Sequence, residues 1–145
     1  MSEPSPADCC SCGRFEEASG AALRVEDAID GDGMAQAYAY LRDLEGSPRH
    51  IDRYADLLYR FETFALTGEL DVPRELRHLV GEIWEIKTSR DRVPFYKVKH
   101  AGQSDGLVAR LTHGFEKRKG RTVDGKIPRK HLDKAAWIAR EDQKR

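Results

Sequence analysis

The sequence predicts an α+β fold. Between residues 33 and 68, apolar residues recur at steps of three and four, which is the period of an α-helix. Between residues 81 and 115, apolar and polar residues alternate, which is the period of a β-strand. No helical segment separates the alternating runs, so we expect an antiparallel sheet. A last helix begins at Pro128, and together these elements predict an N-terminal helical hairpin packed on a small antiparallel β-sheet, with a C-terminal helix.

The first half divides into a tail, a short strand and the hairpin. Residues 1–21 are rich in Ser, Pro, Gly, Cys and acidic residues and lack periodicity, which predicts a flexible tail ahead of one domain over residues 22–145. Within that domain, Ala22–Ile29 favours a short first strand, although its alternation is imperfect. Two helices are expected over residues 32–46 and 47–68, each ending at a glycine.

The second half contains the sheet. Three strands are expected over residues 81–88, 95–100 and 107–115, joined by turns that contain Arg, Asp, Ser and Gly. A basic loop over residues 118–126 separates the last strand from the C-terminal helix.

Three cysteines lie close together in the tail, at positions 9, 10 and 12. A structural zinc site requires four ligands, usually in two separated pairs, and no second pair exists here. Metal binding and an inert, reduced tail both remain open, and we expect no cofactor. The chain lacks a secretory signal and an apolar run long enough to span a membrane, which predicts a cytoplasmic protein without a membrane partner.

The formal net charge of zero conceals two oppositely charged halves. Up to Glu85 there are 18 acidic and 8 basic residues, and from Ile86 onward there are 7 acidic and 17 basic residues. This asymmetry favours a polyanion ligand for the second half, provided that the fold keeps its cations together. If the fold mixes the two halves, the surface charge averages out instead.

The candidate site residues belong to the basic half. Lys87, Tyr96, Lys97, Lys99 and His113 lie on the expected strands, and Lys117, Arg118, Lys119 and Arg121 follow them. The sequence contains no nucleophile elbow, phosphate loop or zinc-protease motif. Cationic and proton-transferring side chains without such motifs suit metal-free cleavage of RNA, in which the 2′-OH attacks its own phosphate.

Four segments resemble the RelE/HigB superfamily of type II toxins, in particular its phage-derived HigB-like branch. They are LVGEIWEIK at Leu79–Lys87, YKV at Tyr96–Val98, LTHGFEKR at Leu111–Arg118, and the helix that begins at Pro128. The third segment is the most specific. The sequence departs from the family at Lys97, where an arginine is usual, and at His131, where the family often has an acidic residue.

The resemblance implies a RelE-like fold and a ribosome-dependent mRNA endonuclease that a cognate helix-turn-helix antitoxin inhibits. Carried over by position, Lys87 and Lys97 would stabilise the phosphorane, and His113 or Tyr96 would transfer protons. The RNA backbone would be bound by the remaining cations, namely Lys99, Lys117, Arg118, Lys119 and Arg121. A non-catalytic, phage-derived protein that binds RNA or the ribosome is the alternative, and a DNA-binding or protein-interaction module is a third possibility.

Overall fold

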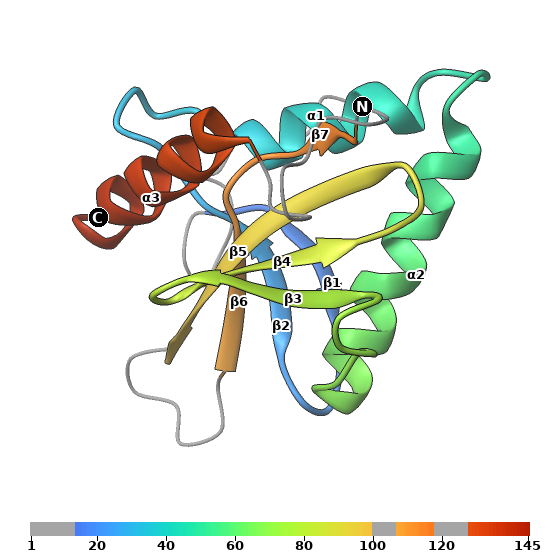
Figure 1. The fold of residues 1–145 in the computed structure, drawn as a ribbon, viewed down its shortest axis with the longest axis horizontal. Helices are drawn as coiled ribbons and strands as arrows, with labels where there is room; N and C mark the ends of the chain where they lie inside the picture. The colour runs from blue at the N-terminus through green and yellow to red at the C-terminus, as the bar shows by residue number, and fades with distance from the viewer. Residues whose placement is uncertain (1–13, 100–106, 118–127) are drawn as a thin grey trace.

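The computed structural model describes residues 14–99, 107–117 and 128–145. Within these ranges the chain forms three helices and seven strands, in the order β1 (Glu16–Ser19), β2 (Arg24–Asp27), α1 (Gln36–Glu45), α2 (Ile51–Thr67), β3 (Leu76–Val80), β4 (Ile83–Lys87), β5 (Asp91–Lys99), β6 (Leu107–Leu111), β7 (Phe115–Glu116) and α3 (Arg129–Gln143). The strands form one sheet of order β1-β2-β6-β5-β4-β3, and β7 pairs with the start of β5 (Figure 1).

The predicted N-terminal helical hairpin on a small antiparallel sheet is wrong, and with it the RelE-like architecture. Two strands precede the helices, and the sheet of the described residues is mixed, with seven strands, because β2 runs parallel to β6. The first two strands have only four residues each, which is too short for a reliable period-two signal. Local periodicity also carries no information about pairing across more than 80 residues, such as that of Val25 with Ala109.

The tail was predicted to extend to residue 21, but folded structure begins earlier. Strand β1 lies inside that range, and Arg14 is buried. The three cysteines lie outside the described residues.

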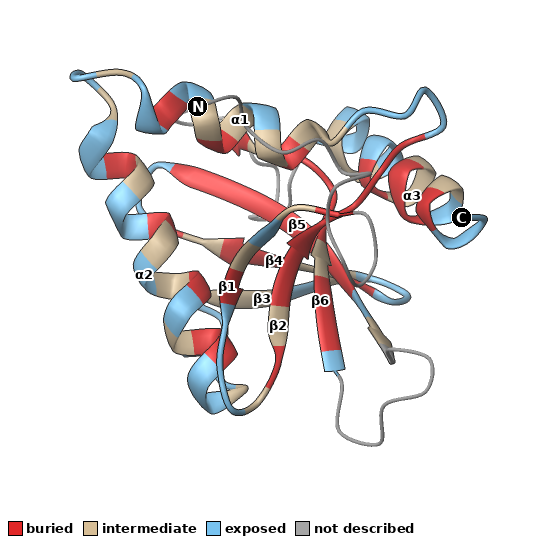
Figure 2. Cartoon of the chain, turned by 180° about the vertical axis from the view of Figure 1, so that it is seen from behind, coloured by how far each residue is buried: buried red, intermediate tan, exposed pale blue. Residues whose placement is uncertain are grey.

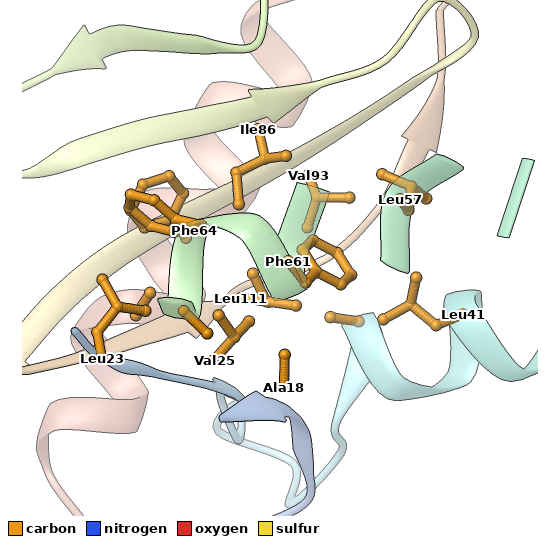
Figure 3. Packing of buried hydrophobic residues seen from close by; sticks show 14 of the residues in the cluster. Ala18, Leu23, Val25, Leu41, Leu57, Phe61, Phe64, Ile86, Val93 and Leu111 are labelled. Carbon is orange, nitrogen blue, oxygen red and sulfur yellow. The ribbon is translucent and has the colours of Figure 1, made fainter. Parts of the chain in front are cut away.

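Helices cover both faces of the sheet. Val93 and Phe95 of β5 point into the larger apolar cluster, which α1 and α2 close with Leu41, Leu57, Phe61 and Phe64 (Figure 3). Tyr96, one position further along, points to the opposite face, where it packs against Ala135, Ile138 and Ala139 of α3. Strand β5 is therefore buried along most of its length, as Figure 2 shows.

Helix α2 agrees best with the sequence pattern. Leu57, Phe61 and Phe64 form its buried stripe, and Gly68 ends it in the left-handed conformation (φ 75°) that glycine adopts without steric cost. In the part of the chain that is described, none of the helices is long and apolar enough to cross a bilayer.

A buried carboxylate near the end of α3 fastens that helix to the sheet. One oxygen of Asp142 accepts hydrogen bonds from Arg14 Nη2 (2.7 Å) and from the Ile29 amide (2.8 Å). The other accepts from Arg110 Nη1 (3.1 Å) and from the Tyr96 hydroxyl. Burial raises the pKa of Asp142, but the hydrogen bonds from Ile29, Tyr96 and Arg14 outweigh it and hold the pKa below its usual value.

A second buried acid lacks hydrogen-bond donors among the described residues. Asp27 of β2 is fully buried, and neither of its carboxylate oxygens accepts a hydrogen bond from a described residue. Burial and the neighbouring Glu17 raise its pKa well above the usual value, whereas Arg42, which forms a 2.8 Å ion pair with Glu17, lowers it. The two acids therefore compete for one arginine, and folding favours the protonated form of Asp27.

We predict that Asp142→Ala destabilises the protein by about 3–5 kcal/mol, because Arg14, Arg110, the Tyr96 hydroxyl and the Ile29 amide would all lose a buried acceptor. The matched control is Tyr96→Phe, which removes one hydrogen bond to the same carboxylate and should cost about 1–2 kcal/mol. Urea unfolding of both variants measures the difference. If Asp142→Ala lowers the free energy of unfolding no more than Tyr96→Phe does, the role of Asp142 as the anchor of α3 is contradicted.

We predict that Asp27→Asn stabilises the protein at pH 7 by about 1 kcal/mol or more. The folded-state pKa of Asp27 is raised, so its contribution is fully present below the ordinary aspartate pKa and is lost as the pH rises through the raised value. The stabilisation by Asn should therefore be larger at pH 7 than at pH 4. Chemical denaturation at both pH values is the measurement. Equal stabilisation by Asn at pH 4 and at pH 7 would contradict the assignment of the effect to the raised pKa of Asp27.

Candidate functional site

Basic side chains from neighbouring strands line up on the face of the sheet that α3 covers in part. Lys87 pairs in register with Arg92 across β4 and β5, and Arg77 of β3 pairs with Glu85, two residues before Lys87. Strands lie about 4.8 Å apart, and residues opposite one another point to the same face. Lys117 follows β7 by one residue and lies close enough to influence Lys87. We call Arg77, Lys87, Arg92 and Lys117 the cationic row.

Two cations of this row, Lys87 and Arg92, are bound by neutral groups. Lys87 Nζ donates to the Pro73 carbonyl (3.0 Å), and Arg92 Nη1 donates to the Asp91 carbonyl (2.9 Å). Neither side chain forms a salt bridge with a described residue. Burial, followed by repulsion from Arg92, lowers the pKa of Lys87, and burial together with Arg77 lowers that of Arg92 against the opposing attraction of Glu85.

One carboxylate lies among these cations without a hydrogen bond. Glu85 of β4 is fully buried, and both of its oxygens lack a hydrogen-bond partner among the described residues. Burial raises its pKa, while Arg92, Arg77 and Lys87 lower it. Glu85 thus opposes the positive charges of Arg92, Arg77 and Lys87, and Asp91 also attracts Arg92.

An aromatic stack borders the row. Phe115 of β7 pairs in register with Arg92, and the His131 ring of α3 stacks on Phe115 with centroids 3.7 Å apart and planes 3° from parallel. His113 lies behind the pair, 5.4 Å from His131 by ring centroids. Gly114, between His113 and Phe115, lets the backbone pass close to Tyr40, because a Cβ at this position would collide with the Tyr40 ring.

The predicted pair Lys87 and Lys97 is separated by the sheet. Lys97 lies on the face that carries α1 and α2, where its ammonium group is 5.5 Å from the centroid of the Phe64 ring. It is exposed, and it shares that face with Val93 and Phe95 of its own strand. Lys87 therefore has Arg92, and not Lys97, as its cationic neighbour.

Tyr96 and His113, the predicted proton-transfer residues, are both buried. The Tyr96 hydroxyl donates to Asp142, and burial and that carboxylate raise its pKa. His113 is only 2% exposed, and burial, with Lys134 and His131 nearby, lowers its pKa to about 3. His113 is thus neutral at physiological pH.

Of the predicted RNA-binding cations, Lys117 is the one whose side chain is described, and it is exposed. Lys99 closes β5, but its side chain is outside the described part of the chain. Arg118, Lys119 and Arg121 also lie outside the described residues. Glu116, between Phe115 and Lys117, points to the opposite face and forms a 3.2 Å ion pair with Arg53 of α2, so its charge is directed away from the row.

Arg77, Arg92 and His131 are not among the site residues expected from the sequence. Arg77 and Arg92 become neighbours of Lys87 only through the registers of β3 with β4 and of β4 with β5. The departure from the family pattern at His131 was the available signal for that residue, because an imidazole in place of an acid changes the chemistry of the position.

Comparison with known proteins adds no relative. No family model matches the sequence, and no curated protein sequence is significantly similar to it.

Proposed function

We propose that this chain binds single-stranded RNA along the cationic row and cleaves it by attack of a 2′-OH on the adjacent phosphate. The observation that carries the proposal is the neighbouring pair Lys87 and Arg92, which are partly desolvated and form no salt bridge with a described residue. Further cations repel them, because Lys117 acts on Lys87 and Arg77 acts on both. A phosphodiester would relieve both the repulsion and the desolvation.

The chemistry supports cleavage for two reasons. Cations that are fixed before the ligand arrives stabilise the charge that develops on a phosphorane without reorganising. Lys87 is held by a backbone carbonyl, and Arg92 is anchored by its own strand. A histidine, His131, stacks on Phe115 beside the row, and an imidazole is a side chain that commonly serves in proton transfer.

The motif resemblance supports a narrower form of the proposal. In that form the chain is a ribosome-dependent mRNA endonuclease, the toxin of a type II toxin–antitoxin pair, and a helix-turn-helix antitoxin inhibits it. The resemblance is confined to short segments, and the architecture differs from the one it implied.

One observation favours the second candidate, an RNA- or ribosome-binding protein without catalysis. Tyr96 and His113, which the resemblance marks for proton transfer, are buried and bonded to other side chains. Binding by the row requires neither of them. Binding and cleavage are therefore tested separately.

We predict that Lys87→Ala/Arg92→Ala weakens binding of a single-stranded RNA by on the order of tenfold for each lost charge. The slope of log K against log salt should fall by about 0.7 for each phosphate contact removed. Fluorescence anisotropy with a labelled oligonucleotide at several salt concentrations measures both. The control, Arg49→Ala/Lys144→Ala, removes the same kinds of charge from exposed positions on other elements. Equal effects of the two double variants would contradict binding at the row.

We also predict that induced expression of the wild type in bacteria slows growth, and that the wild type cuts mRNA in a translating extract. The Lys87→Ala/Arg92→Ala variant should do neither, while Arg49→Ala/Lys144→Ala should behave as the wild type does. RNA binding without cleavage in the extract would leave the non-catalytic candidate. Failure of the wild type to bind RNA at low salt would exclude both.

A further inference from the structure

A buried carboxylate lies among the cations of the row. Glu85 of β4 is fully buried, and neither of its oxygens has a hydrogen-bond partner in the described part of the chain. In register, Arg77 of β3 lies opposite it on one side and Pro94 of β5 lies opposite it on the other. The proline side chain has no group that could donate a hydrogen bond to the carboxylate.

The charges that act on Glu85 are positive. Among the described residues they belong to Arg92, Arg77 and Lys87, one from each of three neighbouring strands. Lys87 is two residues further along β4 and points to the same face, and Arg92 is its cross-strand partner. Because none of them donates a hydrogen bond to Glu85, they attract it through space only. Burial raises the pKa of Glu85 above its ordinary value, although the three cations lower it.

Two other buried acids hold their arginines differently. Asp142 accepts directly from Arg14 (2.7 Å), so this guanidinium is already bound within the protein. Near Asp27, Arg42 forms an ion pair with another acid at 2.8 Å. The cations around Glu85 have neither kind of contact with it, and a ligand can approach them without breaking a hydrogen bond to this carboxylate.

A phosphate bound by Lys87 and Arg92 would place a second negative charge beside Glu85. The phosphate would repel the carboxylate, and it would also offset the positive charges that favour the ionised form of Glu85. Both effects favour the protonated form. Coupling of this kind is reciprocal, so a neutral Glu85 would in turn strengthen the attraction of the two cations for the phosphate.

We infer that Glu85 is the proton-binding group of the cationic row, and that it takes a proton from solvent when an RNA phosphate binds to Lys87 and Arg92. The inference rests on the proposed function, because RNA supplies the phosphate. Glu85 is fully buried, so it regulates affinity without touching the ligand. RNA therefore binds more tightly as the pH falls, by at most about tenfold per pH unit for one proton.

The direction of the pKa shift sets the pH window. Affinity begins to rise when the pH falls to the pKa of Glu85 in the complex, which is higher than its pKa in the free protein. The rise ends once Glu85 is protonated in both states. Because the pKa in the free protein is already raised, the window lies above the ordinary glutamate pKa. Lys87, whose pKa is lowered, adds a separate loss of affinity at alkaline pH that does not require Glu85.

The first test measures the affinity for a labelled oligouridylate by fluorescence anisotropy between about pH 5 and pH 8, where neither uracil nor a phosphodiester changes its charge. Glu85→Gln is uncharged at every pH. At the upper end of the range it should bind the probe more tightly than the wild type by on the order of three- to tenfold, and its affinity should depend less on pH. Glu82→Gln is the control, because it removes an exposed acid from the same hairpin, and it should keep the pH dependence of the wild type.

The second test uses the wild type alone, so it does not depend on whether Glu85→Gln folds. Carbon-13 NMR of the glutamate carboxyl groups follows the titration of Glu85 with and without the oligouridylate, and the midpoint should be higher with it. The same pH dependence in the wild type and Glu85→Gln, or a midpoint that bound RNA leaves unchanged, would overturn the inference while the proposed function stands. A wild type that does not bind the oligouridylate at low salt at any of these pH values would instead overturn the proposed function.

Discussion

The geometry of the molecule depends on the way its longest strand is held from both faces. Tyr96 of β5 is hydrogen-bonded to Asp142 of α3 on one face. At the start of the same strand, Asp91 accepts from the Arg53 guanidinium of α2 (2.6 Å) and from the Tyr40 hydroxyl of α1 on the other face. Both carboxylates are fully buried and fully bonded. Every helix is therefore tied to β5 by a hydrogen bond to one of two buried carboxylates.

The position of the candidate site follows from this arrangement. Fixing β5 sets its register with β4 and with β7, and so places Lys87 and Phe115 on either side of Arg92. Fixing the end of α3 through Asp142 holds the first turn of the same helix, so that His131 meets Phe115. The site lies between the two anchors and needs no hydrogen bond to a carboxylate of its own.

The sequence predicted the elements whose signal is local and missed those whose signal is not. Helix α2 and its glycine stop were expected, and Phe61 and Ala65 of the expected stripe are buried, but Leu57 and Phe64 enter the core in place of Ile51 and Leu58. The parallel pairing of β2 with β6 depends on contacts between distant segments, which no local period records.

The same distinction applies to the site. Lys87 lies beside Arg92, whereas its expected partner was Lys97, and simple alternation along β5 places Lys97 on the opposite face. Alternation of side chains along β7 also explains why Glu116 points to the face opposite Phe115, where it pairs with Arg53. Arg77, Arg92 and His131 could not be found in this way, because cross-strand register and helix docking bring them together.

The two kinds of charged cluster in this fold differ in a way that bears on function. Around Asp142 and Asp91, arginines donate directly to the carboxylate, so burial is compensated within the protein. Around Glu85 the cations are more numerous than the acid, and none of the described residues donates a hydrogen bond to it. Asp27 is likewise buried without a hydrogen bond from a described residue, so an unbonded acid alone does not mark a site. Around Glu85, in addition, Lys87 and Arg92 repel one another without a salt bridge to a described residue, and an anionic ligand would offset that repulsion.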